Sequence, residues 1–263
     1  MIPGRFNSDA AALKQRIASH DKYGSNDLNA WIFDHLQLQT GLAILDLGCG
    51  PGKQSLPLAQ LVGRAGHLLS VDISKEAVEE LWRTARELEL EKRISVLRAG
   101  LDELGEYLEE QTLDRVVASF SLYYARYPQR VLQTLYRALK PGGILFFCGP
   151  SHENNEELKR FHYSLPGGGP VTATGAAVFM EEIGQRLARD LFGEIEPSSF
   201  ENCLRFNSAN ALYSYWSSYN LYDPKLDAEF RVAAAKYFET HSLFETRKRV
   251  IGVKAVKWTV PSV

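Results

Sequence analysis

The chain has 263 residues, of which 45% are hydrophobic and 24% are charged, and its formal net charge at pH 7 is −2. This composition is ordinary for a globular protein, and the length is sufficient to bury a full core. The near-neutral charge excludes a global attraction for nucleic acid or for an anionic membrane surface. No apolar run approaches the ~20 residues that cross a bilayer, and the N-terminus lacks a secretory apolar core, so we expect no membrane contact.

The cysteines limit both the redox compartment and the metal chemistry. Cys49, Cys148 and Cys203 are widely separated, and no CxxC or Cys/His pair has the spacing of a zinc site. An odd number of scattered cysteines indicates reduced thiols rather than a disulfide framework. We therefore expect a cytoplasmic protein that binds no metal.

Taken in chain order, the predicted elements begin with a helical arm over roughly residues 8–38 and then alternate between strand and helix. Short apolar runs bounded by turn residues indicate buried parallel strands at 43–48, 66–73, 94–100, 113–121 and 144–150. This alternation predicts an α/β fold with a doubly wound, Rossmann-like and mostly parallel sheet.

Two of the intervening helices have a clear period. After Ser74, which can cap a helix, apolar residues recur at spacings of three and four, namely Val78, Leu81, Ala85 and Leu88. Val131, Leu135 and Leu139 mark a second helix. We expect that helix to stop at Lys140-Pro141-Gly142-Gly143, just before the fifth strand.

Beyond Pro150 the character of the sequence changes. A glycine-rich loop at 164–175 is a candidate lid or hinge, and a helix is expected over roughly 176–191. The remaining segments are a strand near 194–206, an aromatic-rich segment at 209–222, an amphipathic segment at 224–241 and an alternating, strand-like segment at 244–258. We expect a helical and aromatic lid, and two late strands that close the sheet edge as a hairpin.

The most informative stretch is Asp46-Leu47-Gly48-Cys49-Gly50-Pro51-Gly52, which joins an expected strand to an expected helix. A dinucleotide site needs G-x-G-x-x-G, but here the glycines alternate. The carboxylate of Asp46 would also repel a pyrophosphate. Asp72 ends the next strand, 20 residues after Gly52, where an acid accepts hydrogen bonds from ribose hydroxyls. The pattern therefore favours a ligand with a ribose and a cationic, phosphate-free partner.

Together these residues resemble the class I S-adenosylmethionine-dependent methyltransferases. "LDLGCGPG" is similar to the first motif of the family, "VDIS" to the second, "RAGLDEL" to the third, "LDRVVASFSLYY" to the fourth and "LYRALKPGGILFF" to the approach to strand five. The resemblance covers about residues 40–150 and is greatest to the branch that methylates quinones and natural products. It implies a seven-stranded sheet whose last strand is antiparallel.

The resemblance also implies a division of the chain and a cofactor. Residues 1–40 would form an N-terminal helical arm, 41–150 the core that binds S-adenosylmethionine, and 151–263 a substrate-covering segment with the late strands of the same domain. Methyl transfer would leave S-adenosylhomocysteine as the product.

Contacts to the methionyl part of the cofactor are implied for the first and fourth motifs. Gly48, Cys49 and Gly50 would lie against it, and Ser119, at the end of strand four, would border it. Asp46 would meet the amino group or fix the loop, and the alternative is that its carboxylate only caps turn amides.

The ribose and adenine are assigned to the second and third motifs. Asp72 would hold the ribose, and Ile73 would cover one face of the adenine. Family members often carry an acid directly after the glycine of the third motif, but here Leu101 follows Gly100, and Asp102 stands one place later. Asp102 either substitutes for that acid or does not, so adenine recognition departs from the family pattern.

Methyl transfer from a sulfonium needs an acceptor lone pair held about 3 Å from the methyl carbon, with water excluded. Tyr123 and Tyr124 follow the fourth strand, where either could orient or deprotonate an acceptor, and the alternative is that one of them packs in the core. His162 is a candidate base. In similar enzymes the N-terminal arm folds over the cofactor, which makes Tyr23 a candidate contact. The tyrosines and tryptophan of 209–222 form either a wall for the acceptor or a packing surface.

We therefore expect a metal-independent methyltransferase that acts on an oxygen or nitrogen atom of a small organic acceptor, with carbon still open, as a monomer or homodimer. "SFSLYY" lacks the Asn/Asp-Pro-Pro pattern of members that methylate base or amide nitrogens, and no basic field is present, so we expect no nucleic-acid partner. The alternatives are an NAD(P)-dependent oxidoreductase, a non-catalytic S-adenosylmethionine-binding subunit, and a methyltransferase for a macromolecule such as tRNA.

Overall fold

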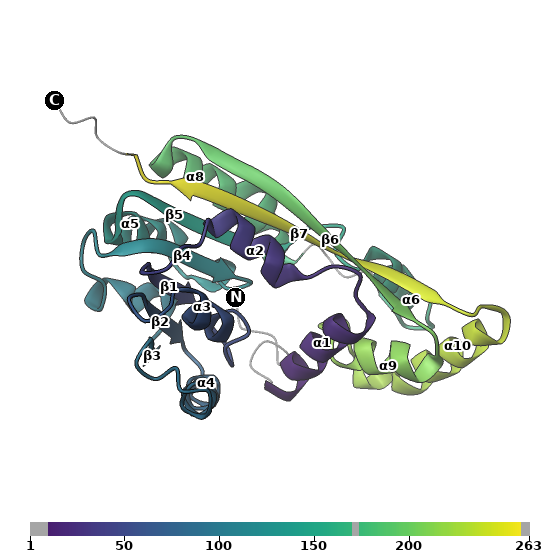
Figure 1. Ribbon diagram of the computed structural model, residues 1–263. Coiled ribbons are helices and arrows are strands. Elements are labelled where there is room, and N and C mark those ends of the chain that lie inside the picture. Colours follow the sequence, from purple (N-terminus) through teal and green to yellow (C-terminus); the bar gives the residue numbers. More distant parts are fainter. Residues whose placement is uncertain (1–9, 170–173, 259–263) are drawn as a thin grey trace. The chain divides into compact units, whose positions relative to one another are not determined.

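The computed structural model describes residues 10–169 and 174–258. A seven-stranded mixed sheet has the order β3-β2-β1-β4-β5-β7-β6 (Figure 1). Its strands are β1 (Ala43–Leu47), β2 (His67–Asp72), β3 (Ile94–Arg98), β4 (Leu113–Ser119), β5 (Leu139–Pro150), β6 (Ile195–Phe206) and β7 (Phe244–Val256). β1 to β5 pair in parallel, whereas β6 and β7 run in opposite directions. The doubly wound, mostly parallel sheet and its antiparallel last strand are confirmed.

The helices alternate with the strands as predicted. The α-helices are α1 (Ala10–Tyr23), α2 (Leu28–Leu36), α3 (Ser55–Leu61), α4 (Lys75–Glu87), α5 (Pro128–Ala138), α6 (Glu156–Tyr163), α7 (Gly175–Val178), α8 (Gly184–Phe192), α9 (Ala209–Ser217) and α10 (Asp227–Thr240). The shorter turns are η2 (Leu101–Glu106), η3 (Leu122–Tyr124), η5 (Pro224–Leu226) and the π-helical η4 (Phe179–Ile183). Within the described ranges, none of these helices has the length and apolarity to cross a membrane.

Helices cover both faces of the sheet because neighbouring residues of a strand point to opposite faces. Phe146 of β5 meets Trp31 of α2, with ring centroids 5.3 Å apart. Phe147, the next residue, meets Phe179 of η4, with ring centroids 6.5 Å apart. Gly252 of β7 leaves room for Trp31, since a Cβ atom there would lie 2.5 Å from the indole.

Two details of the predicted helices are wrong. Leu88 is 48% exposed and follows the end of α4, although Leu81 and Ala85 are buried as expected and Ser74 accepts a hydrogen bond from the backbone N–H of Ala77. Leu139 does not belong to α5, because it is the first residue of β5. There it pairs with Leu113 of β4 and is fully buried, so strand pairing outweighs the helical period.

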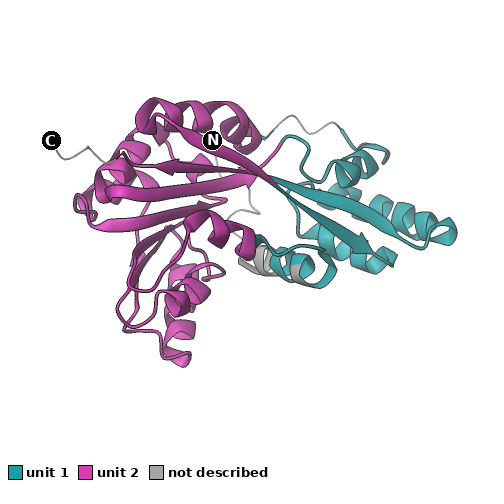
Figure 2. Ribbon diagram, turned by 45° about the horizontal axis from the view of Figure 1, so that its top comes forward, with its two compact units in different colours: residues 1–28, 152–174, 200–250 teal, residues 29–151, 175–199, 251–263 magenta. Residues whose placement is uncertain are grey.

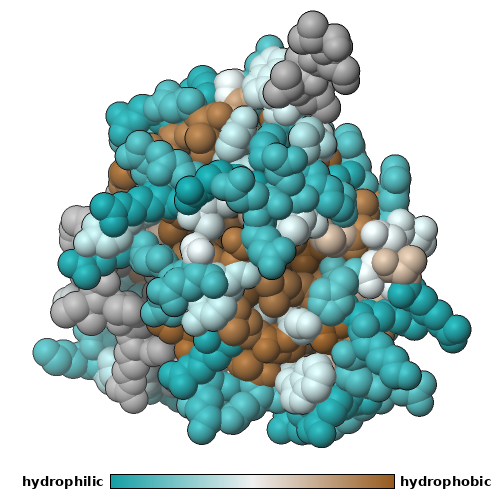
Figure 3. Space-filling model, turned by 90° about the vertical axis from the view of Figure 1, so that its left-hand side faces the viewer, coloured by the Kyte–Doolittle hydropathy of each residue, from teal (hydrophilic) through white to brown (hydrophobic). Residues whose placement is uncertain are grey.

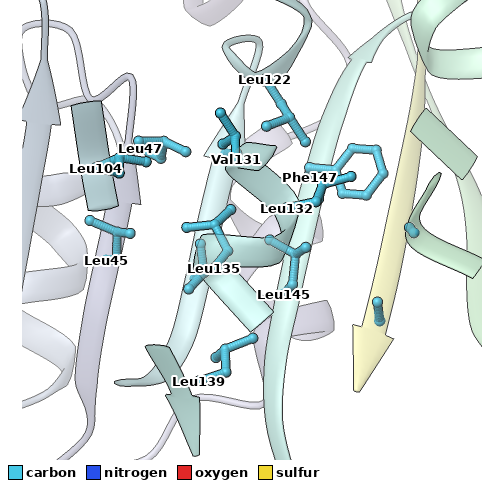
Figure 4. Packing of buried hydrophobic residues seen from close by; sticks show 14 of the residues in the cluster. Leu45, Leu47, Leu104, Leu122, Val131, Leu132, Leu135, Leu139, Leu145 and Phe147 are labelled. Carbon is cyan, nitrogen blue, oxygen red and sulfur yellow. The ribbon is translucent and has the colours of Figure 1, made fainter. Parts of the chain in front are cut away.

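The chain forms two compact units, shown in different colours in Figure 2. Unit 1 comprises residues 1–28, 152–174 and 200–250, and unit 2 comprises 29–151, 175–199 and 251–263. The core of unit 2 joins side chains of β1, β5 and α5, such as Leu45, Leu135 and Phe147 (Figure 4). The core of unit 1 is aromatic and centres on Trp216 and Phe230, whose rings stack with centroids 4.0 Å apart.

Candidate functional site

The turn after β1 carries Gly48, whose φ of +76° lies in the left-handed region that glycine adopts without strain. A Cβ atom on Gly48 would lie 2.2 Å from the Cβ of Ser121, which follows β4. The Ser121 hydroxyl donates to the carbonyl of Leu47, with 2.5 Å between the oxygens. The backbone of the turn therefore lies directly against the segment after β4.

Asp46 is a buried carboxyl group inside a hydroxyl network. Its Oδ2 accepts a hydrogen bond from the Ser55 hydroxyl at 2.5 Å, and Ser55 in turn accepts one from the Ser70 hydroxyl at 3.0 Å. Burial, with a smaller contribution from the charge of Asp72, raises the pKa of Asp46 to about 7. The side chain thus ties β1 to the first residue of α3.

Asp72, the last residue of β2, reaches back to the glycine turn. Its Oδ2 accepts the backbone N–H of Gly50 at 2.8 Å, and its Oδ1 accepts that of Ser74 at 2.8 Å. The structure therefore brings Asp46, the glycine turn and Asp72 together at the carboxyl ends of β1 and β2.

Ile73, directly after Asp72, is 71% exposed. Apolar side chains are not confined to the core, since they also gather among hydrophilic ones on the face seen in Figure 3.

The third motif is held by one local and two longer-range hydrogen bonds. The backbone N–H of Gly100 donates to Glu103 Oε2 at 2.9 Å. The two carboxylate oxygens of Asp102 accept the backbone N–H groups of Arg126 and Tyr127 at 2.9 and 2.8 Å. Leu101 packs against the core of unit 2. The Asp102 carboxylate therefore anchors the segment that precedes α5.

The end of β4 has an unusual backbone. Phe120 has a φ of +56°, which is rare for a bulky residue and costs about 1–3 kcal/mol. Its N–H donates to the carbonyl of Cys148 at 2.8 Å, and the Cys148 thiol lies 3.6 Å from the Ser119 hydroxyl. The sequence does not predict Phe120 or Ser121 as site residues. The one signal available is Gly48, because a glycine there allows another segment of the chain to approach closely.

Tyr123 and Tyr124 lie together in η3, with ring centroids 4.6 Å apart and an interplanar angle of 59°. Tyr124 is 48% exposed, whereas Tyr123 is half-buried and packs against the core of unit 2. The pair thus presents one anchored and one exposed aromatic ring beside the end of β4.

Tyr23 and His162 belong to unit 1. The ring of Tyr23 lies 5.0 Å from that of Phe206. His162 is buried, which lowers the pKa of its imidazole, and its Nδ1 accepts the indole N–H of Trp216 at 3.3 Å. Tyr215 and Trp216 of the aromatic segment are fully buried, so packing is the interpretation that fits these two residues.

Cys49 lies inside the glycine turn and is buried, and burial strongly raises the pKa of its thiol. Within the described part of the chain, no group of three or more His, Cys, Asp or Glu residues could hold a metal ion. The polar groups described at the carboxyl ends of β1 and β2 are carboxylates, hydroxyls and backbone amides.

The family model for the methyltransferase domain matches residues 38–190, which is more than half of the chain. The chain belongs to the class I S-adenosylmethionine-dependent methyltransferase family. The matched range contains the glycine turn, Asp72, η3 and the π turn.

Two curated relatives and one solved structure illustrate the likeness. The chain is 33% identical over 153 residues to the arsenite methyltransferase of Mus musculus, covering 54% of this chain and 40% of that protein. It is 26% identical over 191 residues to the ubiquinone/menaquinone biosynthesis C-methyltransferase UbiE of Psychromonas ingrahamii, covering 69% and 75%. A methyltransferase structure from Aquifex aeolicus shares the fold, with a TM-score of 0.56, 18% identity and coverage of 94% and 98%. The match to the first relative thus spans less than half of that relative's length.

Proposed function

We propose that this chain transfers a methyl group from S-adenosylmethionine to a small organic acceptor. The observation that carries the proposal is the hydrogen bond from Gly50 N–H to Asp72. It joins the glycine turn to the acid at the adjacent strand end, in a chain of this family. Ligands of open α/β sheets bind in the crevice outside the carboxyl ends of the strands.

Asp72 is the proposed ribose ligand. Each of its carboxylate oxygens accepts one backbone N–H, and a carboxylate has about four lone-pair positions, so both oxygens keep capacity for ribose hydroxyls. The exposed Ile73 side chain would gain burial by covering the flat adenine. Gly48, Cys49 and Gly50 would offer backbone to the methionyl part.

Asp46 and Asp102 are proposed as supports of the site. The contact of Asp46 with Ser55 favours the role of fixing the loop over direct contact with the amino group of the cofactor. Both oxygens of Asp102 accept backbone N–H groups, which favours an anchoring role over adenine recognition. The amino group of the cofactor would then meet backbone carbonyls of the turn, with Ser119 nearby.

Tyr123 and Tyr124 are the proposed acceptor contacts, since they follow the strand whose end borders the methionyl side. A positioned tyrosine in its phenolate form, which takes the acceptor proton and becomes the neutral phenol, would contribute roughly 10²–10⁴-fold. The base role of His162 stays a prediction, because its Nδ1 lone pair accepts the Trp216 indole N–H. The cofactor contact of Tyr23 also stays a prediction.

The relatives point to two acceptor classes, arsenite and quinone carbons. Thiolates are the groups that bind soft metalloids, but Cys49 and Cys148 are buried, and burial raises the pKa of the Cys49 thiol and of the half-buried Cys203 thiol. We therefore infer an organic acceptor methylated at oxygen or nitrogen, with carbon as the alternative that the quinone relatives favour.

Calorimetry tests the cofactor. Titration with S-adenosylhomocysteine is expected to give saturable one-site binding, and titration with NAD is expected to give none. Incubation with S-adenosylmethionine and a panel of phenols, hydroquinones and amines should then yield a product heavier by one methylene group in mass spectrometry. Tight NAD binding with no response to S-adenosylhomocysteine would refute the proposal.

A further inference from the structure

The π turn η4 separates α7 from α8 within unit 2. Residues in and directly after the turn stabilise it. The N–H of Gly184 donates to the carbonyl of Phe179, and the side-chain amide of Gln185 donates to the carbonyl of Met180 at 3.0 Å. A Cβ atom on Gly184 would lie 2.7 Å from the Phe179 ring, so glycine is needed where that ring folds back. Single π turns inside helices occur frequently at functional sites.

The π turn brings Met180 against the carboxyl end of β5. A Cβ atom on Gly149 would lie 2.8 Å from Met180 Cγ and 2.9 Å from Tyr123 Cε1. The absent side chain of Gly149 therefore leaves a space that both Met180 and Tyr123 fill. Met180 Sδ lies 3.0 Å from that same Cβ position, so the thioether and the Tyr123 ring lie within about 6 Å of each other, with Met180 fully buried and Tyr123 half-buried in the same core. Contacts between a thioether and an aromatic ring are favourable.

The supported ring lies where an acceptor would bind. Tyr123 follows β4, and the ends of β4 and β5 are neighbours in the parallel sheet, with Ser119 opposite Cys148. The exposed ring of Tyr124 is inclined to that of Tyr123. Two inclined rings suit a flat aromatic molecule, which can stack on one ring and meet the edge of the other.

We propose that Met180 is a positioning residue for Tyr123. We further propose that the rings of Tyr123 and Tyr124 together select flat aromatic acceptors over aliphatic ones. The inference rests on the proposed function and deepens it by naming the acceptor class. It assigns a purpose to three otherwise unrelated features, namely the π turn, the glycine at the end of β5 and the tyrosine after β4.

Methyl NMR tests the contact, because Met180 is the only methionine of the chain besides Met1. In protein labelled with [methyl-¹³C]methionine, the signal missing from the Met180→Leu variant assigns Met180. Tyr123→Leu is expected to shift that signal, since it removes the ring current. Gly149→Ala should also shift it, whereas the matched control Gly105→Ala should not, because the nearest atom to a Cβ at Gly105 is 3.9 Å away. A Met180 signal that ignores Tyr123→Leu overturns the inference.

Binding probes test the acceptor class. In the complex with S-adenosylhomocysteine, menadiol, a flat hydroquinone, is expected to shift the Met180 signal, and ethanolamine is expected to leave it in place. Menadiol affinity should fall by about fivefold or more in Met180→Ala, while S-adenosylhomocysteine affinity stays within about twofold and Met180→Leu restores menadiol binding.

The outcomes separate the two proposals. If S-adenosylhomocysteine does not bind the wild-type protein, the proposed function fails. If it binds but menadiol leaves the Met180 signal unmoved, or ethanolamine shifts it more, only the acceptor inference fails. An equal loss of cofactor and menadiol affinity in both Met180 variants would also overturn it, because it would indicate general disruption.

Discussion

The Cβ of Ser121 fills the space in which a side chain on Gly48 would lie, since a Cβ atom on Gly48 would come within 2.2 Å of it. The Ser121 hydroxyl also donates to the carbonyl of Leu47, directly before that glycine. One small side chain thus holds the turn after β1 against the segment after β4. Because β1 and β4 are neighbouring parallel strands, this contact fixes the edge of the sheet to which we assign the methionyl group.

Gly48→Ala is therefore expected to destabilise the protein and to weaken cofactor binding. The new methyl group would clash with Ser121, and alanine would be strained at the positive φ, so we expect a loss of at least ~1–3 kcal/mol in the free energy of unfolding. Urea unfolding measures the first effect and calorimetry with S-adenosylhomocysteine the second. Gly105→Ala is the control, and equal behaviour of the two variants would contradict the prediction.

Asp72→Ala is expected to weaken S-adenosylhomocysteine binding by more than ~10-fold, because two charge-assisted hydrogen bonds to the ribose would be lost. Asp102→Ala is the matched control. It removes a carboxylate that also accepts two backbone N–H groups, but we expect an affinity change below ~3-fold. Calorimetry of both variants decides the matter. A stronger effect at Asp102 would mean that the third motif, and not the second, carries the recognition.

Most of the fold could be predicted from local periodicity, because the pattern of a helix or strand depends on residues that are close together in the sequence. The apolar run before Gly48 became β1, and the spacing of Leu81 and Ala85 became α4, capped by Ser74 as expected. The prediction that Leu139 belongs to a helix was wrong, because its strand partner, Leu113, lies far away in the sequence. A helical period cannot reveal that a strand partner competes for the same residue.

The support of the site was less predictable for the same reason. Asp102 was considered for adenine recognition, but its partners are the backbone amides of Arg126 and Tyr127. The left-handed backbone of Phe120 and the π turn at Phe179 produce no periodic pattern of apolar residues in the sequence. Motif spacing indicates which residues face a ligand, whereas side chains that hold the motif in place depend on distant partners.

The buried carboxyl of Asp46 should make stability pH-dependent. Its pKa is raised from 3.8 to about 7 in the folded state, so between these values the folded chain binds more protons than the unfolded chain. Stability from this group is therefore fully present below about pH 4 and is lost as the pH rises towards 7, by up to ~4 kcal/mol. Asp46→Asn cannot ionise. Its stability relative to the wild type, measured by urea unfolding, should therefore rise between about pH 4 and pH 7, and a constant difference would be incompatible with the assigned pKa.

His162→Asn separates packing from catalysis. If the imidazole mainly accepts the Trp216 indole N–H, the variant should lose ~1–3 kcal/mol of stability and keep its turnover rate within a few-fold. Burial lowers the pKa of His162, so the folded state favours the neutral ring, and its stability contribution is present above the ordinary pKa of 6.5 and is lost as the pH falls from there through the lower pKa of the folded state. The acid side of the unfolding profile should therefore flatten in the variant. If turnover instead slows by roughly 100-fold or more at unchanged stability, the base role of His162 is favoured, because a positioned proton acceptor contributes an effect of that size.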